Sequence, residues 1–377
     1  MKNKKRVLFV TNKCPHYRMA LFNDLAKKSD VTFYLTDESK RIEGLRSKQI
    51  ISSGKGISKL RVHPSLIREI KSEKYDYVFM LPPDAQHLIN NYLIYFACKK
   101  KKIPFIFWTE RWQYFEMPIR DKISNFLHRF LLRKAYKILV AGKKSKEWIE
   151  FCGIRESKII VAPNASEIHY DKKEMSKIKT ELIKKYKLKD KKVVLYLGRL
   201  INRKGIKYLI DAFYGLKEND TVLMIVGGGD FYKLGEGSVE SKLKNQVKKL
   251  GISDRVIFTG EIEHSETSAY YSLAEIFVYP SITEGISEPW GLTLNEAMQF
   301  ELPIISTDAV GAAYDLIKHG ENGFLVKEKS SEELITPIKR ILNNDNLRKS
   351  MGRLSKKIVD EKNSYSKMLD GFMEAIK

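Results

Sequence analysis

Short apolar runs rich in β-branched and aromatic residues alternate with longer amphipathic segments along all 377 residues of the chain. Fully apolar strands separated by helices are typical of parallel sheets that are covered on both faces. The alternation therefore predicts an α/β protein with two doubly wound parallel sheets. We expect its strands at residues 6–11, 32–35, 77–81, 103–108, 137–141, 158–162, 192–197, 221–226, 255–259, 276–279, 303–307 and 324–326.

The chain is too long for one ordinary hydrophobic core and suits two α/β domains. A polar and charged stretch at residues 164–191, with a helix expected over 173–186, separates the two sets of strands. We expect an N-terminal domain at 1–165, a linker at 166–190 and a C-terminal domain at 191–355. A last helix, 356–377, is expected to pack back toward the N-terminal domain.

The positive charge of the chain is concentrated in its first half. Residues 1–165 contain 34 Lys and Arg against 15 Asp and Glu, a net charge of +19, and the whole chain carries +22. Such asymmetry indicates contact with a polyanion or an anionic membrane, whereas lysines spread over a solvated surface would charge both halves. A nucleic-acid-binding protein is an alternative, but no binding module or stripe of basic and aromatic residues is recognisable. We therefore expect no nucleic-acid partner.

One basic segment has helical periodicity. Residues 120–138 place Ile123, Phe126, Leu127, Phe130, Leu131 and Ala135 near one face, with lysines and arginines around it. Together with Lys99–Lys102, this face could lie on an anionic membrane. The alternative is an ordinary amphipathic helix whose apolar face joins the core.

The three cysteines are few and widely spaced, which argues against a disulfide framework or a cysteine metal site and fits a reducing cytoplasm. The apolar run after the basic start MKNKKR is short and is expected to be the first strand. We expect a cytoplasmic protein, peripheral on the inner face of the cell membrane.

Two glutamates, Glu288 and Glu296, lie in the run EPWGLTLNEAM. Pro289 and Gly291 keep the first glutamate out of a helix, and a helix is expected from residue 294, so both carboxylates should lie at one strand-to-helix corner. Open α/β sheets bind ligands there. Two carboxylates can accept hydrogen bonds from sugar hydroxyls, and the helix N-terminus can hold phosphate. The alternative is a solvated loop acid and an ordinary first-turn glutamate.

Glycines and cations follow two of the expected strands in the second half. The strand KVVLYL is followed by Gly198, Arg199 and Lys204. The two cations place the planar guanidinium of an arginine and the compact ammonium of a lysine beside the start of a helix. This pair suits a diphosphate, although both could be ordinary surface cations. Another strand ends in a glycine cluster that begins at Gly227, which a simple turn also explains.

Residues 190–330 resemble glycosyltransferase family 4, a family of retaining enzymes with the two-domain GT-B fold. The resemblance rests on GRLINRKG, IVGGGD, ISDRVIFTGEI, EPWGLTLNEAM, ELPIISTDAVGAAYDLI and GENGFLV. It implies two Rossmann-like domains that face a central cleft, with the acceptor bound by the first domain and a nucleotide sugar by the second.

The resemblance also implies roles for individual residues. Arg199 and Lys204 would hold the donor diphosphate and stabilise the leaving group, Glu288 would contact the donor sugar, and Glu296 would bind the ribose hydroxyls. Donor contacts are further expected from the backbone at Gly198, Gly227, Gly291 and Leu292. The sequence contains no Asp-x-Asp, the usual means of presenting a divalent metal to a diphosphate. We therefore expect no metal and no cofactor, with a UDP- or GDP-sugar as the donor substrate.

The first half departs from the family in two places. The opening strand ends in a loop with His16, Tyr17 and Arg18, without the glycine pair that is common in the family. We expect these three residues to bind the acceptor, although His16 could equally be structural. Many members carry a histidine where this chain has Glu110, which could take the acceptor proton as a base or pair with Arg111.

Taken together, the sequence predicts a retaining, metal-independent glycosyltransferase that extends a lipid-linked glycan for cell-surface polysaccharide. An epimerase or a phosphorylase of the same fold is an alternative, but an epimerase would need neither an acceptor nor a basic first half.

Overall fold

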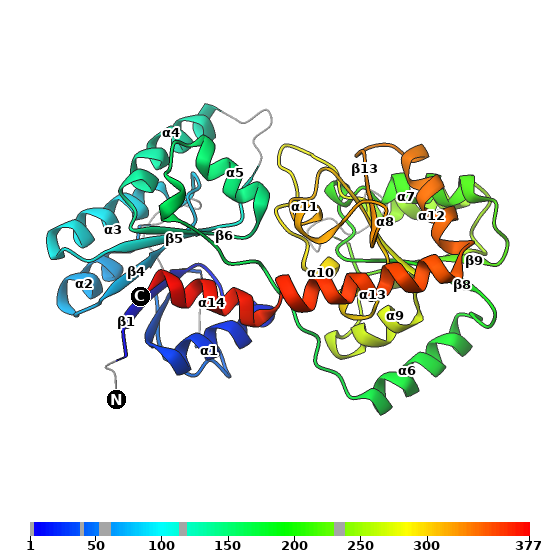
Figure 1. Ribbon diagram of the computed structural model, residues 1–377, viewed down its shortest axis with the longest axis horizontal. Helices are drawn as coiled ribbons and strands as arrows, with labels where there is room; N and C mark the ends of the chain where they lie inside the picture. Colours follow the sequence, from blue (N-terminus) through cyan, green and yellow to red (C-terminus); the bar gives the residue numbers. More distant parts are fainter. Residues whose placement is uncertain (1–3, 38–40, 53–61, 113–118, 230–237) are drawn as a thin grey trace. The chain divides into compact units, whose positions relative to one another are not determined.

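The computed structural model describes residues 4–37, 41–52, 62–112, 119–229 and 238–377. The chain forms two compact units (Figure 1), one made of Met1–Asn164 and Tyr365–Lys377 and the other of Ala165–Ser364. Each unit has its own parallel sheet between layers of helices.

The first unit contains a seven-stranded sheet in the order β3-β2-β1-β4-β5-β6-β7, and all of its pairings are parallel. The six expected strands are present, and β3 is an addition. Its four residues lie at the sheet edge and are mostly half-buried, so the sequence lacks the apolar run that marks a central strand. The strands are β1 (Arg6–Thr11), β2 (Asp30–Leu35), β3 (Lys48–Ile51), β4 (Tyr77–Met80), β5 (Phe105–Thr109), β6 (Lys137–Val140) and β7 (Ile159–Val161).

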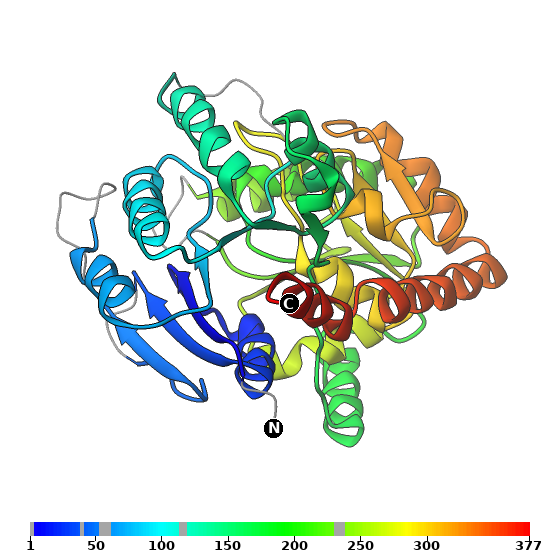
Figure 2. The same ribbon diagram turned by 60° about the vertical axis from the view of Figure 1, so that its left-hand side comes forward.

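Helices cover both faces of this sheet. One face packs Leu8, Val10 and other strand residues against α2, α3, α4 and α5 in a continuous apolar core. The opposite face packs against α1 and α14, which lie side by side although they come from opposite ends of the chain (Figures 1 and 2). The helices are α1 (Met19–Lys28), α2 (Pro64–Ser72), α3 (Leu88–Lys101), α4 (Ile119–Lys134), α5 (Lys143–Phe151) and α14 (Tyr365–Ala375).

The last helix, α14, completes the core of the first unit. Phe372 is fully buried, and its ring lies 6.1 Å from Phe9, 5.7 Å from Phe79 and 5.0 Å from Trp108. The contact is close because Gly371 lacks a side chain: a Cβ at this position would lie 2.7 Å from the Cβ of Ala162. Residues 365–377 therefore belong structurally to the first 164.

The division of the chain differs in detail from the expected boundaries. The expected linker, 166–190, lies within the second unit, where α6 packs against α9. The expected terminal helix, 356–377, is two helices, because α13 ends at Lys362 within the second unit and α14 begins at Tyr365 in the first. Asn363, which follows α13, has a backbone conformation outside the α region, so the helix ends there.

The second unit contains a six-stranded parallel sheet in the order β10-β9-β8-β11-β12-β13. Its strand order reverses between β8 and β11, and ligands of open α/β sheets bind at the carboxyl ends of strands at such a switch point. All six expected strands are present. They are β8 (Lys192–Leu197), β9 (Thr221–Val226), β10 (Val256–Gly260), β11 (Ile276–Tyr279), β12 (Ile304–Thr307) and β13 (Gly323–Val326).

Helices α7, α8 and α12 lie on one side of this sheet, and α9, α10 and α13 lie on the other (Figure 1). The helices of the unit are α6 (Lys172–Lys185), α7 (Ile206–Leu216), α8 (Val239–Lys249), α9 (Thr267–Leu273), α10 (Leu292–Gln299), α11 (Ala313–Leu316), α12 (Glu332–Leu342) and α13 (Asp345–Lys362).

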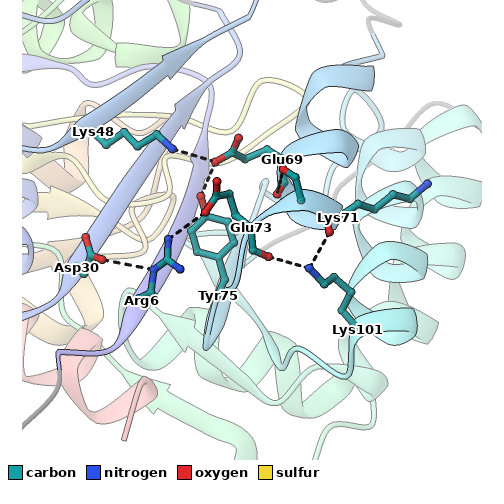
Figure 3. Close-up of polar contacts among 9 residues, drawn as sticks. Arg6, Asp30, Lys48, Glu69, Lys71, Glu73, Tyr75 and Lys101 are labelled. Atoms are coloured by element: carbon teal, nitrogen blue, oxygen red, sulfur yellow. Dashed lines mark hydrogen bonds and ion pairs between the residues drawn. The ribbon is translucent and has the colours of Figure 1, made fainter.

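Several cations of the basic first half have structural partners near the start of β1 (Figure 3). The guanidinium of Arg6 lies 3.2 Å from Glu73 and 3.5 Å from Asp30, and the ammonium of Lys101 donates to the carbonyls of Lys71 and Glu73. Part of the positive charge is therefore used inside the unit, and not all of it is available to a partner.

Candidate active site

The loop after β8 places two of the predicted donor residues differently. Arg199 is exposed, whereas Lys204 is buried at the end of a 3-10 turn, Asn202–Lys204. The turn is held against the end of β11, because the amide of Ile282 donates to the carbonyl of Arg203 at 2.8 Å. The strand-end cations therefore lie at the switch point between β8 and β11.

Lys204 and Glu288 form a buried ion pair, with the Lys204 Nζ donating to the Glu288 Oε2 at 2.6 Å. The same ammonium donates to the Tyr279 hydroxyl and lies 4.7 Å above the centre of its ring. Arg203 adds a second cation, 3.7 Å from the same carboxylate oxygen. Burial raises the pKa of Tyr279, so its hydroxyl remains neutral beside the pair.

Gly291 allows the chain to approach this cluster closely. It precedes α10 with φ of 83°, and a Cβ added to it would lie 2.7 Å from the Cε1 of Tyr279. The helix begins immediately afterwards at Leu292, without a side-chain cap. The Leu294 N–H donates to the carbonyl of Gly291 at 3.0 Å, and the N–H groups of Leu292 and Thr293 have no side-chain cap, so these two can face an anion.

Glu296 lies buried in the second turn of α10, and both of its carboxylate oxygens are held. The Ser166 hydroxyl donates to Oε1 at 2.8 Å, and the Tyr271 hydroxyl donates to Oε2 at 2.9 Å. Burial, followed by the neighbouring carboxylate, raises the pKa of Tyr271 well above its usual range, so the phenol keeps the proton that it donates. Each carboxylate oxygen retains a lone pair for a further hydroxyl.

The two predicted glycines at strand ends pack against each other. Gly227 has φ of 127°, and a Cβ there would lie 2.1 Å from the carbonyl oxygen of Gly198. The ends of β8 and β9 can be this close only because Gly227 lacks a side chain. The remainder of that glycine cluster runs into residues 230–237, which lie outside the described residues.

In the first unit, the structure gives Arg18 a structural set of contacts. Its buried guanidinium pairs with Glu110 at 2.6 Å, donates to Asn164 Oδ1 at 3.1 Å, and lies 4.5 Å above the ring of Trp108. Met368 of α14 accepts from it at 3.5 Å. These contacts join the loop after β1 to the end of β5 and to α14.

The other expected acceptor residues are placed in part. Tyr17 is 37% exposed, and its carbonyl accepts from the hydroxyl of Tyr365. The backbone of His16 lies in the 3-10 turn His16–Arg18, but its side chain falls outside the described residues. Glu110 pairs with Arg18, while Arg111 donates instead to the carbonyl of Pro83 at 3.1 Å.

Four residues of the clusters around Lys204 and Glu296 were not predicted from the sequence: Ser166, Arg203, Tyr271 and Tyr279. Tyr271 and Tyr279 lie in apolar stretches, where an aromatic residue is usually part of the core. Ser166 lies in a polar stretch far from the motif that it supports. Only Arg203 carried a signal, as a third cation beside Lys204.

In the part of the chain that the structure describes, no three His, Cys, Asp or Glu side chains are grouped so that they could share a metal ion. None of the helices in that part combines the length and the apolar character that crossing a membrane requires.

The clusters around Lys204 and Glu296 fall within a segment shared with a known family. Residues 178–358 match the family of glycosyl transferases group 1. The resemblance of the second half to glycosyltransferases is thereby confirmed.

Two curated proteins show the extent of the likeness. An uncharacterized glycosyltransferase of Methanocaldococcus jannaschii is 30% identical over 176 residues, which cover 47% of this chain and 42% of the relative. The capsular polysaccharide biosynthesis glycosyltransferase CapM of Staphylococcus aureus is 28% identical over 259 residues, or 66% and 62%. The chain thus spans less than two thirds of the length of these relatives.

Among solved structures, HepE of Anabaena in complex with UDP superimposes with a TM-score of 0.78 at 18% sequence identity. The superposition covers 98% of this chain and 99% of that one. Both parallel-sheet units are therefore those of a GT-B fold, as the sequence predicted.

Proposed function

We propose that this protein is a retaining glycosyltransferase that moves a sugar from a nucleoside diphosphate to a glycan acceptor. The observation that carries the proposal is the buried cluster of Lys204, Glu288 and Tyr279 at the switch point of the second sheet. A buried ion pair is costly unless it has good geometry and further hydrogen bonds, and it often marks a functional site. The family match of residues 178–358 supports the assignment.

The cations at the end of β8 would bind the donor diphosphate. Lys204 is held by a carboxylate, and Arg199 is exposed in the same loop after β8, so we propose that an incoming diphosphate takes one ammonium and one guanidinium together. When the phosphate oxygens draw Lys204 away, Glu288 Oε2 loses its nearest donor, while Arg203 stays 3.7 Å from it. That oxygen can then accept hydrogen bonds from the hydroxyls of the donor sugar.

Glu296 would bind the ribose of the donor. Ser166 and Tyr271 each hold one carboxylate oxygen, which fixes the plane of the group before the ligand arrives. The remaining lone pairs can accept the two ribose hydroxyls without a rearrangement. The UDP bound by HepE supports UDP as the nucleotide to test first, with GDP as the alternative.

During transfer the anomeric C–O bond breaks, the diphosphate takes the electron pair, and the acceptor oxygen bonds to the anomeric carbon as it loses its proton. Lys204 and Arg199 would stabilise the charge that grows on the diphosphate, and Glu288 the charge on the sugar ring. Because these cations can supply the positive charge, we propose that no divalent metal is required. Full activity in EDTA supports this step, and strict dependence on Mg²⁺ or Mn²⁺ contradicts it.

The acceptor would bind to the first unit, at the ends of β1 and β5. Glu110 is fixed by Arg18 but keeps part of its surface exposed, so it can be a base for the acceptor hydroxyl. The name of CapM, a capsular polysaccharide biosynthesis glycosyltransferase, supports a role in cell-surface polysaccharide, and we propose a lipid-linked glycan as the acceptor. A Glu110→Gln variant with unchanged kcat would remove the base from this proposal.

The experiment that tests the function combines a panel of UDP- and GDP-sugars with lipid-linked glycan acceptor. Release of nucleoside diphosphate that depends on both substrates supports glycosyl transfer. Conversion of the nucleotide sugar without an acceptor would instead indicate an epimerase, and phosphate-dependent cleavage of a glycan would indicate a phosphorylase. Retention is tested by the anomeric configuration of the product in NMR spectra.

A further inference from the structure

Helices α3 and α4 bury polar as well as apolar side chains. Their buried positions include Asn90, Asn91, Ser124 and His128 beside core residues such as Ile94 and Leu131. These groups are hydrogen-bonded inside the unit: Asn91 Nδ2 lies 3.2 Å from His128 Nε2, and His128 Nδ1 lies 2.9 Å from the carbonyl oxygen of Ser124. A helix facing water normally places its polar residues outward and its apolar residues inward.

The outward positions of the same two helices carry large apolar side chains. We call this surface the α3–α4 outer face. It consists of Ile89, Phe96, Ile119, Ile123, Phe126 and Phe130, with exposed fractions of 46%, 58%, 76%, 54%, 73% and 44% in that order.

The spacing of these residues makes the outer face continuous. Those on α4 recur at intervals of three or four, which keeps them on one side of the helix. Tyr92 joins the two helices, because its ring lies 6.4 Å from Phe130 and 6.3 Å from Phe96. Figure 1 shows α3 and α4 side by side, away from α1 and α14. Contiguous exposed apolar surfaces of this kind mark interaction sites.

The same surface is strongly basic. Lys99 and Lys100 lie in the last turn of α3, Lys122 and Lys134 lie on α4, and all four are exposed. None of the ion pairs found among the described residues involves any of these four lysines, in contrast to Arg6 in Figure 3. Arg129 lies 5.6 Å from the ring of Phe151, which is 77% exposed on α5, so the combination of cation and exposed ring continues beyond α4.

We propose that the α3–α4 outer face docks on an anionic lipid surface. Aromatic and aliphatic side chains would enter the boundary between headgroups and acyl chains, and the lysines around them would pair with anionic headgroups. A second copy of this chain is a poorer occupant, because a symmetric contact would bring two lysine-rich faces together. The proposal does not depend on glycosyl transfer, since lipid binding is measured without a donor or an acceptor.

The test is flotation of the full chain with vesicles of phosphatidylcholine alone and of phosphatidylcholine mixed with phosphatidylglycerol. We expect binding to the anionic vesicles, weakened by salt because the lysine contacts are screened. The double variant Ile123→Ser with Phe126→Ser should lower the partition coefficient at least about tenfold, since both side chains leave the insertion face. Lys99→Glu with Lys122→Glu should lower binding to anionic vesicles in particular.

The matched controls are Tyr214→Ser, which removes an aromatic side chain that is 48% exposed on α7, and Lys207→Glu on the same helix. Both should bind vesicles like the unaltered protein, and all variants should keep its thermal transition because the altered side chains are exposed. Failure of the unaltered protein to bind anionic vesicles overturns the proposal. So does equal binding by the outer-face variants, or a dimer in sedimentation that Phe126→Ser dissociates without an effect on lipid binding.

Discussion

Lys204 and Glu288 lie 84 positions apart in the sequence and meet at 2.6 Å in the fold. Each residue could be predicted from its own motif. The sequence does not show that the two form an ion pair with each other when no ligand is bound. Tyr279, which joins the pair, closes an apolar strand and is indistinguishable from a core residue by pattern. The identities at this site were therefore predictable in part, and its hydrogen bonds were not.

The buried pair predicts an unequal effect of single and double substitutions on stability. Lys204→Ala leaves the Glu288 carboxylate buried without its nearest cation, which should lower the free energy of unfolding by about 3–5 kcal/mol. The double variant Lys204→Met with Glu288→Gln removes both charges and should be closer to the unaltered protein. Urea denaturation measures both, with Lys207→Ala as an exposed control on the adjoining helix. A double variant as unstable as the single one would contradict the account of the pair.

At the scale of elements, the strands were largely predictable because buried parallel strands are continuous apolar runs. The exception, β3, lies at an edge, and its sequence KQII has too few apolar residues to stand out. For the segment 120–138, the type of element was predictable but its orientation was not. Its periodicity predicted a helix, but not which face is buried: Leu131 and Ala135 are in the core, whereas Ile123 and Phe126 are exposed.

The importance of the close approach between Gly291 and Tyr279, at the corner between β11 and α10, can be tested by comparing two glycines with nearly equal φ angles. Gly291 has φ of 83° and Gly320 has φ of 82°, but only Gly291 is close to another side chain, Tyr279. Alanine at either position should cost about 1 kcal/mol for the left-handed conformation. Gly291→Ala should lose additional stability and most donor binding, because its Cβ would lie 2.7 Å from the Tyr279 ring. Equal losses in thermal denaturation and nucleotide titration would show that the close approach is unimportant.

Helix α4 predicts a pH dependence of stability. Burial lowers the pKa of His128 to about 4 from an ordinary value near 6.5. The neutral imidazole of His128 fits its surroundings. The amide nitrogen of Asn91 donates to His128 Nε2, which must therefore carry no proton, and the same nitrogen also faces the carbonyls of Leu81 and Pro82. The contribution of neutral His128 to the free energy of unfolding is thus complete above pH 6.5. It is lost as the pH falls toward 4, because the unfolded chain takes up the proton first.

The loss should amount to about 3 kcal/mol between these two pH values. Denaturant titrations of the unaltered protein and of His128→Asn at pH 7 and pH 4.5 measure it, and the variant should show a smaller change. His319→Asn, at an exposed histidine of the second unit, is the control. A variant with the same pH dependence as the unaltered protein would assign the effect to other groups.

At the scale of the whole molecule, the chain forms two units and returns to the first at its C-terminus. The sequence predicted two sheets because strands alternate with helices and a polar stretch at residues 164–191 separates two sets of strands. It did not predict where the last segment divides, since α13 and α14 are both amphipathic and only two residues separate them. Helix α14 belongs to the first unit because Phe372 packs among aromatic residues of that unit, and this packing depends on the tertiary structure.

The returning helix predicts a stability effect in the first unit. Phe372→Ala removes a fully buried ring that contacts Phe9, Phe79 and Trp108, so it should cost about 3–5 kcal/mol. Glu374→Ala, at an exposed position of the same helix, should have little effect. Tryptophan fluorescence during denaturation follows the change, and a normal transition in Phe372→Ala would contradict the role of α14 in this core.

The central claim is that the switch point of the second sheet binds a nucleoside diphosphate through Lys204. Calorimetric titration with UDP and with GDP tests it most directly, on the unaltered protein, on Lys204→Met and on the exposed control Lys207→Ala. We predict saturable binding of one of the two nucleotides by the unaltered protein and the control. Binding to Lys204→Met should be about 10- to 100-fold weaker, as expected for the loss of one charge-assisted hydrogen bond. Absence of binding by the unaltered protein, or equal affinity in a folded Lys204→Met variant, would contradict the claim.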